Sequence, residues 1–135
     1  DAQNGDAKAQ TTLGVMYFTG QAISKDESGK ILSTDAAKAA AWFHRAALQG
    51  NADAEFNLGL MYATGQGGLT QDSTKAVEFF QKAALKGNAD AQNNLGAMYQ
   101  LGEGIEKNDV KAKEWYTKSA AQGNSDAQAN LETLD

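Results

Sequence analysis

Asn51-Ala-Asp-Ala-Glu-Phe-Asn-Leu-Gly-Leu-Met-Tyr62 recurs 37 residues further on as Asn88-Ala-Asp-Ala-Gln-Asn-Asn-Leu-Gly-Ala-Met-Tyr99. The core of this phrase, Leu-Gly-x-Met-Tyr, occurs a third time from Leu13, and each copy is followed three residues later by a glycine. A fourth, partial copy begins at Asn124. Self-similarity at a period of about 36 residues is typical of stacked arrays, whose units are too small to bury their apolar faces alone.

Each unit is expected to contain two helices. In the first helix of the first unit, Ala9, Leu13, Met16 and Tyr17 fall on one face of a helix with 3.6 residues per turn. The second helices carry aromatic and alanine stripes on one face. We interpret these stripes as core: Ala39, Trp42, Phe43, Ala46 and Ala47; Ala76, Phe79, Phe80, Ala83 and Ala84; Ala112, Trp115, Tyr116, Ser119 and Ala120.

Capping residues recur at fixed places. Asparagine precedes each later first helix, and Asp or Asn precedes each second helix, both of which are preferred N-caps. Each second helix ends at a glycine, which suits the left-handed cap that stops a helix. A glycine also recurs inside the first helix, which predicts a close approach by a neighbouring helix. These positions are Asn51, Asn88 and Asn124; Asp35, Asp72 and Asn108; Gly50, Gly87 and Gly123; Gly14, Gly59 and Gly96.

These phrases together resemble the Sel1-like repeat, a relative of the tetratricopeptide repeat. The resemblance implies an all-α fold, a right-handed α/α solenoid with the first helices lining its concave side. It covers three full repeats and a terminal helix in a single domain over 1–135, with units at 6–50, 51–87, 88–123 and 124–135. The first unit departs from the pattern by a longer connector at 20–34, and the fourth departs after Leu131. The connector is either a tolerated surface insertion or a loop that contacts a partner.

Bulk composition excludes several kinds of function. A formal net charge of −5 argues against nucleic-acid binding, which needs a positively charged surface. The sequence has no apolar run long enough for membrane insertion. The absence of cysteine excludes a disulfide framework and leaves the compartment open. The resemblance alone favours a bacterial periplasmic or secreted location. Residues 1–5 look like the end of an earlier unit, so we expect Asp1 to lie inside a longer array or at a plain polar start.

The predicted binding site is the concave groove lined by the outward faces of the first helices, and we expect it to hold a peptide or a helix of a partner protein. Asn57, Asn94 and Asn130 hold equivalent places, and an amide can both donate to and accept from a peptide backbone. In related tetratricopeptide groups an asparagine beside this leucine contacts the ligand backbone. The alternative is that these amides bond locally. The predicted set is Lys8, Thr12, Val15, Phe18, Asp53, Phe56, Asn57, Leu60, Asp90, Asn93, Asn94, Gln100 and Asn130.

No catalytic residue, metal site or cofactor is predicted. The sole histidine, His44, has no cysteine partner and no recurring acid at a fixed offset, and we interpret it as a solvated residue on a helix face. Some relatives have been labelled as β-lactam-hydrolysing, so a weak hydrolase of β-lactam or cell-wall substrates is an alternative, although the Ser-x-x-Lys and Lys-Thr-Gly words are absent. A purely architectural segment of a longer array is the other alternative.

Overall fold

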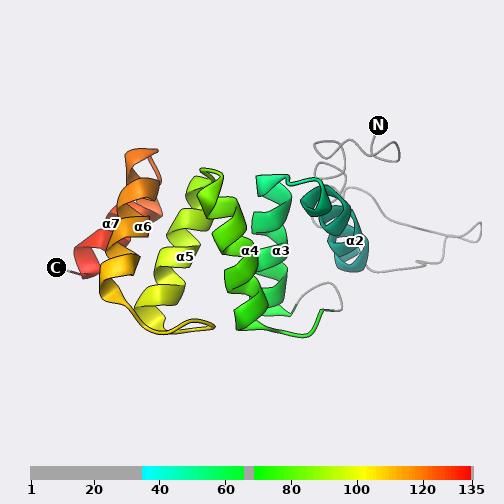
Figure 1. Cartoon of the computed structure of the whole chain (residues 1–135), viewed down its shortest axis with the longest axis horizontal. Helices are drawn as coiled ribbons and strands as arrows, with labels where there is room; N and C mark the ends of the chain where they lie inside the picture. The colour runs from blue at the N-terminus through cyan, green and yellow to red at the C-terminus, as the bar shows by residue number, and fades with distance from the viewer. Residues whose placement is uncertain (1–34, 66–68, 135) are drawn as a thin grey trace, which may run out of the picture.

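The structure is a computed structural model that describes residues 35–65 and 69–134. All regular secondary structure in these ranges is helical, which confirms the predicted all-α repeat solenoid. The helices follow one another in chain order along the long axis of the molecule (Figure 1). They are α2 (Asp35–Leu48), α3 (Ala52–Thr64), α4 (Ser73–Leu85), α5 (Ala89–Leu101), α6 (Asp109–Ala121) and α7 (Ser125–Thr133). Thus α3, α5 and α7 are first helices of repeats, and α2, α4 and α6 are second helices.

The asparagines that begin the first helices each have a double role. Asn88 Oδ1 accepts from the Ala91 amide at 2.8 Å, which confirms the predicted N-cap. The Nδ2 of the same side chain donates to Asp53 Oδ1 of the preceding repeat at 3.0 Å. Asn124 repeats the arrangement with Asp90. An aspartate could cap the helix but could not donate this second bond.

The second helices use their cap residue for capping alone. Asp72 Oδ1 accepts from the Lys75 amide at 3.1 Å, and Asn108 Oδ1 accepts from the Lys111 amide at 3.0 Å. Because these N-caps only accept a hydrogen bond and need no N–H donor, aspartate and asparagine cap the second helices equally well. The predicted cap Asp35 lies inside helix α2, and its side chain is outside the described part of the molecule.

Glycines at the helix ends have the predicted left-handed backbone. Gly50, Gly87 and Gly123 have φ values of +82°, +95° and +91°. The amide that follows each glycine bonds back into the helix it has left, as Asn51 does to the Ala46 carbonyl at 3.2 Å. The chain therefore reverses direction within two residues, so the next first helix lies antiparallel beside the second helix.

The mid-helix glycines permit the close approach that the sequence predicts. A Cβ on Gly59 would lie 2.5 Å from Cε1 of Phe80, and a Cβ on Gly96 would lie 2.7 Å from Cδ1 of Tyr116. Both rings are buried. Helices α3 and α5 are thus each in close contact with a buried aromatic ring of the second helix of the same repeat. The equivalent Gly14 lies outside the described residues.

Burial follows the predicted stripes in most positions and corrects them in others. Ala54, Leu58 and Met61 are buried as expected. One ring of each adjacent aromatic pair is only half-buried instead of buried, namely Trp42, Phe79 and Trp115. Phe79 stacks on Tyr62 with ring centroids 5.6 Å apart. Phe79 also meets the ring of His44 from the preceding repeat, with centroids 6.3 Å apart, so its ring lies where two repeats meet.

Two buried polar residues, Glu55 and Gln92, were not predicted. Glu55 is 3% exposed and forms an ion pair with Lys86 at 2.7 Å. The Lys86 ammonium also donates to the Gly50 carbonyl at 3.0 Å. One repeat later the same two places hold Gln92 and Gln122, whose amides are 2.9 Å apart. Lys86 thus reaches the preceding repeat at Gly50, and Gln92 donates to the Ala84 carbonyl of its own preceding repeat at 3.2 Å, so the period of one helix cannot reveal these contacts.

Candidate binding surface

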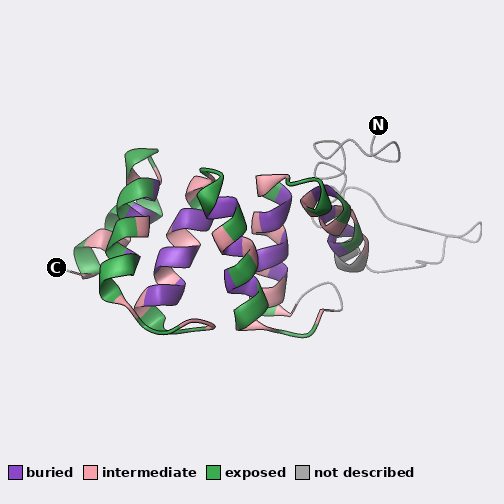
Figure 2. Ribbon diagram, in the orientation of Figure 1, coloured by how far each residue is buried: buried purple, intermediate pink, exposed green. Residues whose placement is uncertain are grey.

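The outward faces of α3, α5 and α7 form a continuous surface, which we call the A surface. Apart from the exposed Asp53 and Asp90, its residues are half-buried, and the apolar ones among them also pack against the core: Phe56, Asn57, Leu60, Asn93, Asn94, Ala97, Gln100 and Asn130. The outward residues of the second helices, which we call the B surface, are mostly exposed, as Lys82, Glu78 and Lys111 are. Figure 2 shows this exposure along α4 and α6. Side chains on the tighter side of a curved array screen one another, so this difference favours the A surface as the inner side.

The amides on the A surface do not all have the same partners. Asn130 Nδ2 donates to Asn93 Oδ1 at 2.9 Å, which joins α7 to α5. In the preceding repeat the place of Asn93 is taken by Phe56, which has no polar atom to offer. Asn94, the counterpart of Asn130, accordingly has no side-chain hydrogen bond within the described ranges. Asn57 likewise has none there. Two half-buried amides thus keep their donors and acceptors available.

Other predicted site residues are engaged in the fold. Gln100 accepts from the Tyr116 hydroxyl at 2.7 Å and donates to the Thr133 hydroxyl at 2.9 Å. Asp53 and Asp90 each accept one bond from an asparagine cap, yet both side chains remain exposed and charged. The local-bonding alternative therefore describes Gln100, Asn93 and Asn130, whereas Asn57 and Asn94 are left for another role.

Apolar side chains border these amides. Phe56 packs at 6.0 Å, centroid to centroid, against the buried ring of Phe80 while part of it stays accessible. A hollow of about 30 Å³ opens beside Asn57 and Leu60, with Phe43 and Met61 on its walls. This volume is enough for a water-sized or methyl-sized group. The sequence had placed Phe43 and Met61 in the core, and only the packing of α2 against α3 shows that they also line a surface hollow.

Four predicted site residues of the first repeat, Lys8, Thr12, Val15 and Phe18, lie outside the described residues, as does the connector at 20–34.

His44 is not the solvated residue that the sequence analysis expected. Its ring is half-buried and meets Tyr62 and Phe79 edge-on, with centroids 6.2 Å and 6.3 Å away. Burial lowers the pKa of His44 below its usual 6.5, and the positive charge of Lys75 lowers it further. The prediction was wrong because the two rings that cover His44 come from the following repeat.

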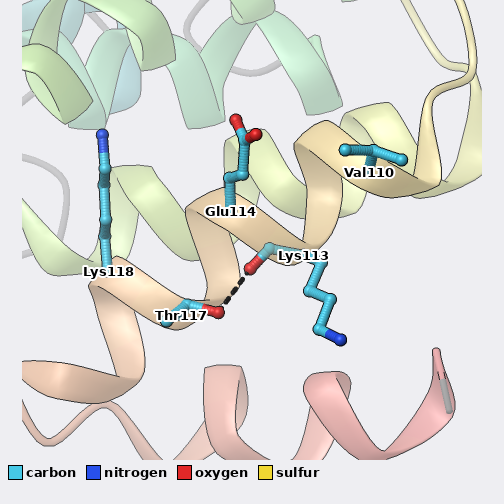
Figure 3. A pocket seen from close by; sticks show the side chains of 5 residues that line it. All are labelled: Val110, Lys113, Glu114, Thr117 and Lys118. Atoms are coloured by element: carbon cyan, nitrogen blue, oxygen red, sulfur yellow. Dashed lines mark hydrogen bonds between the residues drawn. The ribbon is translucent and has the colours of Figure 1, made fainter.

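A second hollow lies on the outward flank of α6. It measures about 460 Å³ and is lined by Val110, Lys113, Glu114, Thr117 and Lys118. Figure 3 shows that these five side chains are spread along one helix and do not converge on one point. In the preceding repeats the place of Lys113 is occupied by Ala40 and Val77, each 4% exposed beneath the next helix pair. The hollow is an uncovered helix flank and not a pocket with converging polar groups.

No group of three His, Cys, Asp or Glu side chains within the described ranges is arranged to hold a metal ion. None of the described helices is long and apolar enough to cross a membrane.

These features define a class of protein: a helical repeat solenoid whose units are short antiparallel helix pairs. The Sel1 repeat family model matches three times, at residues 7–51, 52–88 and 89–124. The chain belongs to the Sel1 repeat family, which confirms the predicted resemblance. Sel1 repeats are generally protein–protein interaction modules, and proteins of this family are typically non-catalytic scaffolds.

Solved structures of bacterial proteins are similar over most of this chain. The protective antigen c5321 of uropathogenic Escherichia coli, which displays an SLR fold, is 41% identical with a TM-score of 0.81, over 94% of this chain and 25% of that one. A Sel1 repeat protein from Oxalobacter formigenes is 32% identical with a TM-score of 0.80, over 95% and 49%. Helicobacter pylori cysteine rich protein B is 26% identical with a TM-score of 0.65, over 70% of each chain.

This chain therefore spans a quarter to a half of the length of the first two relatives. The sources of the three similar structures point to a bacterial origin. A comparison with curated protein sequences found no match.

Proposed function

We propose that this protein binds an extended peptide segment of a partner protein on its A surface. The observation that carries the proposal is the pair of half-buried amides, Asn57 and Asn94, that occupy equivalent places one repeat apart and have no side-chain hydrogen bond among the described residues. A side-chain amide offers one acceptor and two donors, which match the carbonyl and N–H groups of an extended backbone. Phe56 and Leu60, between and beside the two amides, supply apolar contact for the side chains of the bound segment.

In the free protein, water forms the hydrogen bonds of a half-buried amide that has no protein partner. A ligand backbone that displaces this water forms the same hydrogen bonds, now shielded from bulk solvent. Each such bond contributes about 0.5–1.5 kcal/mol. Loss of one amide should therefore weaken binding about 2- to 10-fold. The contribution is modest because apolar contacts with Phe56 and Leu60 supply the remainder.

The test is a selection from a displayed peptide library on the immobilised protein, followed by affinity measurements on the enriched peptides. Asn57→Ala and Asn94→Ala should each weaken binding about 2- to 10-fold. Gln81→Ala is the matched control because it removes a half-buried amide from the B surface. Thermal melting of each variant checks that the fold is kept. Undiminished binding by the Asn57→Ala, Asn94→Ala double variant would remove the A surface as the site.

A further inference from the structure

Charge is divided between the two surfaces of the solenoid. The three described first helices contain five carboxylates and no lysine or arginine: Asp53, Glu55, Asp90, Asp126 and Glu132. The three second helices contain seven cations against four carboxylates: Lys38, Arg45, Lys75, Lys82, Lys111, Lys113 and Lys118. Within residues 35–65 and 69–134, the remaining cations are Lys86 and Lys107, both in connections. The charged side chains of the described first helices are thus all negative, whereas the described second helices carry more positive than negative charges.

Most of this negative charge is not neutralised within the described structure. Lys86 pairs with Glu55 and accounts for that carboxylate. The partners of Asp53 and Asp90 are neutral amides, which hold one carboxylate oxygen of each and leave the charge in place. The Asn88 and Asn124 bonds also fix where each carboxylate lies, so the charge is positioned before any ligand arrives.

The fixed carboxylates and the available amides share one geometry. Asp53 precedes Asn57 by four residues, and Asp90 precedes Asn94 by the same interval. Residues four apart lie on the same helix face with Cβ atoms about 5–6 Å apart. The second and third repeats therefore each present one aspartate and one available amide side by side. A ligand whose backbone is held by the amide brings a side chain within reach of the aspartate.

We infer that the segment bound on the A surface is cationic, with a lysine or arginine facing Asp53 and another facing Asp90. This inference rests on the proposed function. It is carried by two independent observations: the amides of Asn57 and Asn94, which have no side-chain partner among the described residues and can bond to a peptide backbone, and the separation of charge, which selects the side chains. A cation on the ligand gains an attraction that a neutral or acidic segment lacks, and an acidic segment is repelled.

Spacing refines the inference. The Asn88–Asp53 bond brings the start of α5 beside the start of α3, as the Asn124–Asp90 bond does for α7 and α5, and packed helices lie about 8–10 Å apart. A polyproline II segment returns to the same side every three residues, over about 9 Å. Cations at every third position of an extended ligand would therefore meet consecutive aspartates. The expected ligand pattern is Lys/Arg-x-x-Lys/Arg.

The experiment uses three pools of labelled nonapeptides with blocked ends, in which every third residue is lysine, glutamine or glutamate and the others are randomised. Fluorescence anisotropy measures the affinity of each pool for the whole chain. The lysine pool should bind most tightly, and its advantage should fall about 3- to 10-fold in the Asp53→Asn, Asp90→Asn variant. Both replacements keep an oxygen that accepts from the asparagine caps, and thermal melting checks the fold.

The control is Glu103→Gln, Glu106→Gln, which makes the same change in net charge on the exposed connection between α5 and α6. It should leave the advantage of the lysine pool unchanged at about 150 mM salt, where the Debye length is about 8 Å. Equal loss in both variants would show attraction by overall charge alone and would overturn the inference.

The Asn57→Ala, Asn94→Ala variant separates the two proposals. If the glutamine or glutamate pool binds as well as the lysine pool and loses affinity in this variant, the proposed function stands and the cationic ligand is wrong. If no pool binds, or if binding is indifferent to the asparagines, the proposed function fails and the inference falls with it. If the lysine pool alone binds and depends on both the asparagines and the aspartates, both proposals are supported.

Discussion

The contact between Gly59 and Phe80 leads to a prediction with a definite sign. Alanine at position 59 places a methyl group 2.5 Å from Cε1 and 2.6 Å from Cδ1 of Phe80. Carbon atoms pack best at about 3.5–4.0 Å, so the ring must move by about 1 Å. Phe80 is 2% exposed and has no open side into which to move. Overpacking of this kind costs about 1–3 kcal/mol.

Helix propensity acts in the opposite direction and is too small to prevail. Replacing a mid-helix glycine by alanine stabilises a helix by about 1 kcal/mol. The expected net result for Gly59→Ala is a loss of about 1–2 kcal/mol in the free energy of unfolding, because the ring must move a full ångström. Urea denaturation followed by circular dichroism measures this value, and the melting temperature should fall by about 4 °C per kcal/mol.

A double-mutant cycle isolates the cause. Phe80→Leu removes the ring atoms that the new methyl group would meet, so Gly59→Ala in that background should be neutral or stabilising by up to about 1 kcal/mol. Gly96→Ala should repeat the loss, since the ring of Tyr116 is held by its hydroxyl bond to Gln100 at 2.7 Å. A stabilising effect of Gly59→Ala in the unaltered chain, or an equal loss with and without the Phe80 ring, would refute the close-contact explanation.

Three further outcomes follow from the structure. Because the pKa of His44 is lowered in the folded state, the unfolded chain takes up the proton first as the pH falls. The free energy of unfolding should therefore fall as the pH drops below 6.5, and this loss should be complete below the folded-state pKa. His44→Gln, which copies Gln81 of the next repeat, should reduce the dependence of the free energy of unfolding on pH between about pH 7.5 and 5.5, measured by urea titration. Lys86→Ala should lower the free energy of unfolding by about 1–3 kcal/mol by leaving the Glu55 carboxylate buried and unpaired, whereas the double change to glutamine, copying the next repeat, should stay within about 1 kcal/mol of the original chain. Gly87→Ala has open space around it but a φ of +95°, so it should cost about 1 kcal/mol in the same assay by strain alone, and a stabilised variant would contradict the left-handed cap.

Local sequence signals predicted the elements well because each acts within a few residues. The asparagine caps, the terminal glycines and the buried face of the first helices depend on hydrogen bonds or contacts at short separation. The mid-helix glycines were also interpretable, since a costly residue that recurs needs a steric reason. These features placed α3 to α7 and the close approach of a neighbouring helix at Gly59.

Features that depend on the angle between repeats could not be predicted. Val77 is buried and its counterpart Lys113 is exposed, although both occupy the same place in their helices. Glu55 is buried because Lys86 of the same repeat folds back over it, and His44 is covered by rings from the following repeat. The A surface was predicted as a set of residues, but the difference between the engaged Asn130 and the available Asn94 became visible only from the side chain opposite each.

The asparagine shared between neighbouring units has a consequence for how the array melts. Asn88 secures the start of its own helix and holds Asp53 of the unit before it, so fraying at one unit removes an anchor from the next. Unfolding should therefore begin at one end of the array and spread inward one repeat at a time, and should not begin in a central repeat. A peptide bound across two adjoining repeats would stabilise both against unfolding, and by more than its contacts with either repeat alone would provide.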